Sequence, residues 1–180
     1  MRKTAFFTSI LLAVLWCIPQ YGVFSVQQAA GASRYEQERQ GGTSRQSPNQ
    51  LRAQTNYAGD IMSLTNAERR KARLPELVAD NELVAATALR ARELATRFAH
   101  TRPDGSSFDT VLREFRVRPY KSWGENILYN MHEAPADAVK TWMNSPGHRA
   151  NILNKGFTHT GVGVHRSGGK TYVVQIFVGR

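Results

Sequence analysis

The C-terminal part of the chain constrains the fold most. Two segments rich in valine, 160–166 and 171–178, flank Ser167-Gly168-Gly169-Lys170. Valine and other β-branched residues are typical of strands. Two glycines between two such segments can adopt the positive φ angles of a tight hairpin turn. The chain is therefore predicted to end in an antiparallel β-hairpin.

Apolar periodicities of three to four residues precede the hairpin and predict helices. The predicted helices cover 57–73, a segment capped by Asp80 or Asn81 that reaches Phe98, 107–115, 134–143 and 148–153, with an extended segment over 123–129. In the second helix, apolar residues up to Phe98 form the buried stripe and arginines occupy the other side. Along the chain, the predicted helices come first and the predicted strands last. This order favours an α+β fold, with an antiparallel sheet covered by helices, over alternating βαβ units.

Gly161 and Gly163 do not form a nucleotide-binding loop. They lie within a predicted strand and not between a strand and a helix, as a phosphate-binding turn requires. We expect them instead to let two backbone layers approach each other.

The N-terminus has the pattern of a secretory signal peptide. Arg2 and Lys3 precede an apolar run over 5–18, which is too short to anchor the chain across a bilayer. Ala30-Gly31-Ala32 fits the small residues of a cleavage site, and cleavage after Ala30 is an alternative. The sequence therefore predicts a signal peptide over 1–32 and a secreted, extracellular protein.

Cys17, the only cysteine of the chain, lies inside the predicted signal peptide. The mature domain is therefore expected to be free of cysteine, which excludes disulfides, a cysteine nucleophile and zinc–thiolate ligation. Lipidation of Cys17 is disfavoured because the bulky Trp16 precedes it.

The segment 33–55 is predicted to be a disordered polar linker, because Tyr35 and Leu51 are its only large apolar residues. The remaining residues, 56–180, suffice for one compact domain.

The formal net charge of +10 points to an anionic neighbour. For an exported protein, an anionic cell envelope or membrane surface fits better than nucleic acid; a solvated basic face without a partner is the alternative.

His100, Glu125 and His148 are the candidate site residues, since each lies at the edge of a predicted element. Two imidazoles suit a divalent cation, for which zinc is the preferred choice, with His100 and His148 as ligands. Glu125 would join them as a ligand or act as general base toward a bound water. The alternative is that both histidines brace loops and Glu125 caps a helix or pairs with an arginine. His132, His159 and His165 are weaker candidates, expected at the surface.

Serine catalysis has no support, because the chain has no G-x-S-x-G turn. Ser145 has a structural explanation: its side chain is expected to cap the short helix that follows, with Pro146 at the first helical position.

Four motifs, F-A-H-T-R-P-D-G (98–105), W-G-E-N-I (123–127), W-M-N-S-P-G-H-R-A-N-I-L (142–153) and F-T-H-T-G-V-G-V (157–164), resemble those of bacterial CAP (SCP-like) domains. The resemblance covers about 57–177. It implies an α-β-α sandwich with a central antiparallel sheet and an open cleft lined by two histidines and acidic residues, which match His100, Glu125 and His148. Many eukaryotic members carry a second glutamate where this chain has Ser145, and their disulfides are also absent.

The family resemblance leaves three functions open. The favoured one is a secreted binding module whose cleft holds a divalent cation and a small, lipid or envelope-derived ligand. The second is a metal-assisted hydrolase of peptide or envelope substrates, and the third is a structural or adhesive envelope protein.

Overall fold

The structure is a computed structural model that describes residues 46–117, 120–130 and 134–180. The predicted signal peptide, residues 33–45 of the predicted linker, and His132 lie outside these ranges. All the residues that the structure describes belong to one compact unit.

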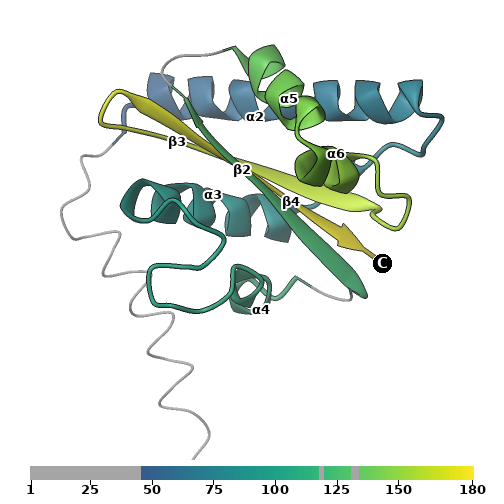
Figure 1. Cartoon of the computed structure of the whole chain (residues 1–180). Coiled ribbons are helices and arrows are strands. Elements are labelled where there is room, and N and C mark those ends of the chain that lie inside the picture. Colours follow the sequence, from purple (N-terminus) through teal and green to yellow (C-terminus); the bar gives the residue numbers. More distant parts are fainter. Residues whose placement is uncertain (1–45, 118–119, 131–133) are drawn as a thin grey trace, which may run out of the picture. The chain divides into compact units, whose positions relative to one another are not determined.

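A four-stranded sheet forms the middle layer (Figure 1). Its strands are β1 (Val78–Ala79), β2 (Ser122–Asn130), β3 (His159–Ser167) and β4 (Lys170–Gly179), in the order β1-β3-β4-β2. β3, β4 and β2 pair antiparallel, and the predicted hairpin is confirmed, with φ of 56° at Gly168 and 73° at Gly169. β1, which the sequence analysis did not predict, adds a two-residue parallel pairing to β3.

Helices cover both faces of this sheet. α2 (Pro48–Lys71), α5 (Pro135–Asn144) and α6 (Pro146–Ile152) lie on one face, and α3 (Asn81–Thr96) and α4 (Thr110–Glu114) lie on the other (Figure 1). The predicted α-β-α sandwich is therefore confirmed. No helix among the described residues is both long enough and apolar enough to cross a membrane.

Successive side chains of β4 point to opposite faces of the sheet and pack in two different hydrophobic cores. Val173 and Phe177 pack in the core on the α2 side, which includes the fully buried Trp142. Val174 and Ile176 pack in the core on the α3 side. Both faces of β4 are thus buried, as expected for the central strand of a sandwich.

α2 begins nine residues earlier than the predicted start at Tyr57. Ser47 and Gln50 form a capping box, and Pro48 takes a first-turn position that costs no hydrogen bond. The first turns remain largely exposed, with Leu51 at 52%, which agrees with their polar composition. Residues 48–55 of the predicted linker are therefore helical.

α3 begins as predicted, because the Asp80 side chain accepts a hydrogen bond from the Leu83 amide. It ends at Thr96, where Arg97 turns to an extended conformation. The prediction that Phe98 belongs to the buried stripe is wrong: Phe98 lies beyond the helix and is 44% exposed.

The two glycines of β3 bring α3 into direct contact with the sheet, as predicted. A β-carbon at Gly161 would lie 2.5 Å from the Leu83 carbonyl carbon, and one at Gly163 would lie 2.0 Å from the Thr87 carbonyl oxygen. No side chain fits between the two backbones. Main-chain contact therefore sets the spacing between α3 and β3.

Candidate functional site

β2 lies at one edge of the sheet and presents neighbouring residues to opposite layers. Glu125 is opposite Ile176, on the α3 side, whereas Asn126 is opposite Gln175, which contacts Thr65 of α2. This edge strand therefore has polar contacts with both helical layers.

Arg90 of α3 holds the Glu125 carboxylate. Its Nε lies 2.9 Å from Oε1 and its Nη2 lies 3.3 Å from Oε2, and neither side chain is exposed. The guanidinium also donates to Glu93, at 2.9 Å, and to the carbonyl oxygen of Ala99, at 3.0 Å. Arg90 therefore neutralises the buried glutamate and also fixes the chain next to His100.

The expectation that the arginines of this helix face solvent is wrong for Arg90, which is fully buried. Its position could have been found from the sequence. Arg90 lies three residues after Thr87 and four before Leu94, within the stripe that packs on the sheet.

His100 is the exposed end of this arrangement. Its Nδ1 lies 2.8 Å from Oε2 of Glu125, while its side chain is 57% exposed. Because a carboxylate only accepts hydrogen bonds, Nδ1 carries the proton and Nε2 is left with its lone pair in the neutral ring.

A second ion pair fixes the loop that carries His100. Nη2 of Arg102 lies 2.6 Å from Glu93 and 3.0 Å from Glu114 of α4, and Nη1 donates to Thr110. The Arg102 residue is only 8% exposed. Glu93 thus holds the loop on both sides of His100. It pairs with Arg102 on one side, and on the other it pairs with Arg90, which donates to the carbonyl oxygen of Ala99.

His148 approaches β2 from the other layer. Its Nδ1 lies 2.9 Å from Oγ of Ser145, and its carbonyl oxygen accepts a hydrogen bond of 3.1 Å from Asn126. Burial, followed by the charge of His100, lowers the pKa of His148 below its usual value. His148 therefore favours the neutral form that binds metals.

Ser145 stands at the N-cap position of α6, but the predicted capping hydrogen bond of its side chain is absent. Its Oγ contacts the His148 ring instead of a first-turn amide. Pro146 does occupy the first helical position, as predicted.

Asn126 and Asn151 connect α6 to β2. Nδ2 of Asn151 lies 2.9 Å from Oδ1 of Asn126 and 3.3 Å from the carbonyl oxygen of Glu125. Asn126 is fully buried. Neither asparagine was predicted as a site residue from the sequence, although both stand within the motifs that contain Glu125 and His148.

The structure thus brings His100 into contact with Glu125 on β2, and it joins His148 to the next residue of the same strand, Asn126, through a hydrogen bond to the His148 carbonyl oxygen. The two other histidines that the structure describes lie elsewhere: His159 contacts Thr158, and His165 is half-buried in β3 beside Arg92. Among the residues described, no three or more His, Cys, Asp or Glu side chains gather to hold a metal ion.

The sequence of this domain matches a known family. The family model described as the cysteine-rich secretory protein family (CAP) matches residues 62–177, more than half of the chain.

Two relatives come from Bacillus subtilis strain 168. YkwD, described as an uncharacterized protein, is 40% identical over 127 residues, covering 69% of this chain and 48% of that protein. YlbC, described as an uncharacterized membrane protein, is 36% identical over 129 residues, covering 71% of this chain and 36% of that protein. The chain therefore spans half or less of the length of either relative.

Solved structures share the fold. An extracellular SCP-domain protein from Bacillus anthracis is 26% identical, with a TM-score of 0.67, over 77% of this chain and 45% of that one. A cysteine-rich secretory protein from Staphylococcus aureus is 23% identical, with a TM-score of 0.60, over 71% of this chain and 40% of that one.

Proposed function

The chain belongs to the cysteine-rich secretory protein (CAP) family, and we propose that it is an exported binding module that holds a divalent cation and a small ligand at the edge of β2. The cation would bind to Nε2 of His100 and Nε2 of His148. One observation carries the proposal: Nδ1 of each imidazole is already occupied, by Glu125 in one layer and by Ser145 in the other.

The donor set fits a cation with open coordination positions. Zinc accepts imidazole nitrogen, and hydrogen bonds at the other ring nitrogen are the usual means of orienting such ligands. With two protein ligands, the remaining positions would be filled by water or by a ligand molecule. A site of this kind suits reversible binding better than permanent structural zinc.

The surroundings of Glu125 favour a positioning role over the roles of ligand and general base. Both carboxylate oxygens accept hydrogen bonds, and the side chain has no exposed surface. Direct ligation or proton abstraction from water would require Glu125 to give up contacts to Arg90 or His100. This consideration favours the binding module over a metal-assisted hydrolase in which Glu125 is the base.

Calorimetric titration of the full chain with zinc tests the proposal. We expect one ion per chain, at least about tenfold weaker binding for His100→Ala or His148→Ala, and no measurable binding for the double variant. His159→Ala is the matched control, because it removes a histidine at the start of β3. Circular dichroism of each variant would verify the fold. Unchanged zinc affinity in the double variant would refute the proposal.

Export is supported by the pattern over 1–32 and by the likeness to an extracellular protein from Bacillus anthracis. Expression of the full chain in a Gram-positive host, followed by N-terminal sequencing of the protein in the medium, tests it. We expect a mature protein that begins after Ala30 or Ala32. Recovery of the uncleaved chain inside the cell only would contradict export.

A further inference from the structure

Half-exposed aromatic rings gather at the hairpin end of the sheet. Phe98 is 44% exposed and Tyr129 is 45% exposed; their rings meet edge to face, with centroids 4.8 Å apart. Tyr172, opposite Tyr129 on β4, continues the group at 6.1 Å. One step along the same face, Ile127 and Val174 are buried. The rings therefore lie where the cover of the α3 layer ends.

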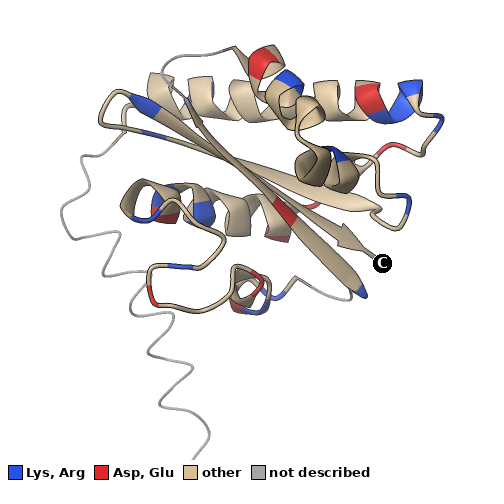
Figure 2. Ribbon diagram, viewed as in Figure 1, with Lys and Arg blue, Asp and Glu red and all other residues tan. Residues whose placement is uncertain are grey.

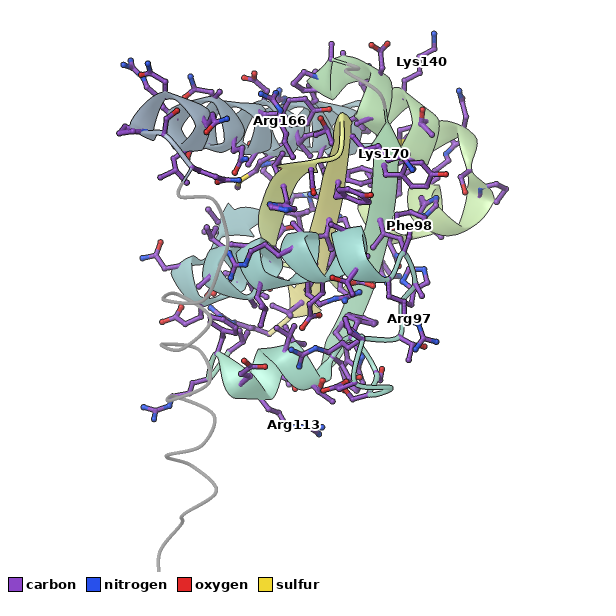
Figure 3. The ribbon with its side chains drawn as sticks, turned by 90° about the vertical axis from the view of Figure 1, so that its left-hand side faces the viewer. Arg97, Phe98, Arg113, Lys140, Arg166 and Lys170 are labelled. Atoms are coloured by element: carbon purple, nitrogen blue, oxygen red, sulfur yellow. The ribbon has the colours of Figure 1, made fainter. Side chains whose placement is uncertain are left out.

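Two cations accompany these rings. Nζ of Lys170 lies 4.8 Å from the centroid of the Tyr129 ring, in cation–π geometry. Arg97, directly before Phe98, is exposed, and Figure 3 shows Lys170, Phe98 and Arg97 following one another along one side of the molecule. We call Arg97, Phe98, Tyr129, Lys170 and Tyr172 the aromatic–basic surface.

The two cations of this surface have no acidic partner among the residues that the structure describes. Among the described residues, neither Lys170 nor Arg97 forms a salt bridge. A further cation, Arg92, lies close enough to His165 for its charge to lower the pKa of that histidine. By contrast, Arg90 and Arg102 of the same layer are paired with glutamates. Basic residues also outnumber acidic ones over the whole chain, which carries a formal net charge of +10, and Figure 2 shows basic positions near the turn between β3 and β4. An anionic partner would complement this surface.

We propose that the aromatic–basic surface binds an anionic polysaccharide, with a sugar ring against Phe98 and Tyr129 and the acidic groups of the polymer against Lys170 and Arg97. Aromatic rings offer a flat apolar face together with the polar edge of the Tyr hydroxyl, which suits the mixed apolar and hydroxylated faces of a sugar. Flanking cations supply charge-assisted contacts to carboxylates or phosphates.

A lipid bilayer fits this surface less well. Among the described residues, the exposed apolar part of the aromatic–basic surface consists of aromatic rings with no aliphatic side chain, whereas interfacial helices insert a longer apolar face. Single-stranded nucleic acid is bound in basic grooves that track its backbone, whereas two cations, Lys170 and Arg97, flank the rings here. The choice of a polysaccharide over nucleic acid rests also on the proposed export. Binding at the aromatic–basic surface is independent of the proposed zinc site at His100 and His148.

The test measures binding of the full chain to three polymers by fluorescence titration. Polygalacturonate has sugar rings and charge, dextran has rings only, and polyphosphate has charge only. We expect polygalacturonate to bind tightest. Phe98→Ala and Lys170→Glu should each weaken its binding by about fivefold or more, whereas zinc binding by the same variants should not change.

Two control variants are matched to these changes. Trp123→Ala removes an aromatic side chain that is 47% exposed at the opposite end of β2. Lys155→Glu makes the same change of charge beyond the opposite end of β3. Neither should weaken polygalacturonate binding by more than about twofold, and that difference between surface and control variants supports the proposal.

Three outcomes would overturn the proposal. Polyphosphate binding as tightly as polygalacturonate, with Phe98→Ala unaffected, would reduce the interaction to charge alone. An equal loss in Lys155→Glu and Lys170→Glu would mean that net charge acts without a defined surface. Tighter binding to phosphatidylglycerol vesicles or to single-stranded DNA, lost in Phe98→Ala, would assign the surface to a membrane or to nucleic acid.

Discussion

The guanidinium of Arg90 and the carboxylate of Glu125 share two hydrogen bonds, of 2.9 and 3.3 Å, with no part of either side chain exposed. A buried ion pair of this kind contributes little net stability, but removal of one partner leaves an uncompensated charge in the interior. The same pair orients His100 through the second oxygen of Glu125. Stability and site geometry therefore depend on the same two residues.

Replacement of Arg90 by alanine is expected to lower the free energy of unfolding by about 3–5 kcal/mol, because Glu125 would remain buried without its partner. Arg92→Ala, on an exposed position of the same helix, should change it by less than about 0.5 kcal/mol. Urea unfolding followed by tryptophan fluorescence measures both. Equal effects of the two substitutions would contradict the structural role of Arg90.

Replacement of Ser145 by alanine should weaken zinc binding about tenfold without altering the fold, since the Ser145 hydroxyl contacts Nδ1 of His148 but makes no capping bond to α6. Calorimetry gives the affinity, and the nitrogen shifts of the His148 ring report its tautomer. Unchanged affinity together with an unchanged tautomer would show that Ser145 does not position His148.

Gly163→Ala is expected to prevent folding or cause severe destabilisation, because the new β-carbon would lie 2.0 Å from the Thr87 carbonyl oxygen. Gly59→Ala provides the opposite control. Gly59 lies within α2, with nothing within 4 Å of the added β-carbon, so alanine should stabilise the protein by about 0.5–1 kcal/mol. Thermal melts of the two variants should shift in opposite directions.

Stability should decrease in mildly acidic solution. Burial is the first cause that lowers the pKa of both His148 and His165 from the usual 6.5. As the pH falls through 6.5, these histidines therefore take up protons in the unfolded chain before they do so in the folded protein, and the free energy of unfolding decreases. The decrease is complete only below the lowered pKa values of the folded state. Urea midpoints at pH 7.5 and 5.5 measure this change. The double variant His148→Gln/His165→Gln should show a smaller difference, and an equal difference would rule out these histidines as its cause.

The secondary structure was predictable where local signals and burial agree. The hairpin followed from Gly168 and Gly169, the start of α3 from Asp80, and the close approach of two layers from the glycines of β3. The end of α3 was not predictable from the same signals. Phe98 continues the apolar spacing of the helix, but the extended conformation of Arg97 takes it out of the stripe.

The candidate residues of the site were identifiable, but the contacts that orient them were not. His100, Glu125 and His148 stand out by residue type and by motif. The spacing of Arg90 within α3 places it in the buried stripe, but nothing local indicates that its partner is Glu125, on a strand that follows α4 along the chain. Arg69 presents the same case: fully buried, it donates to the carbonyl oxygens of Pro75, Ile152, Asn154 and Phe157. Apart from the bond to Pro75, these contacts join residues far apart in sequence, and local patterns do not encode them.

The neighbouring positions of Glu125 and Asn126 on β2 have a consequence for changes of chain length. Side chains of a strand alternate, so insertion or deletion of one residue before this pair would turn Glu125 toward α6 and Asn126 toward α3. Arg90 would then lose the Glu125 carboxylate and keep only Glu93, and the carbonyl oxygen of His148 would lose its amide donor. A single-residue shift would thus detach the His100 ring and the His148 backbone from the strand while every amino acid of the site was still present in the chain.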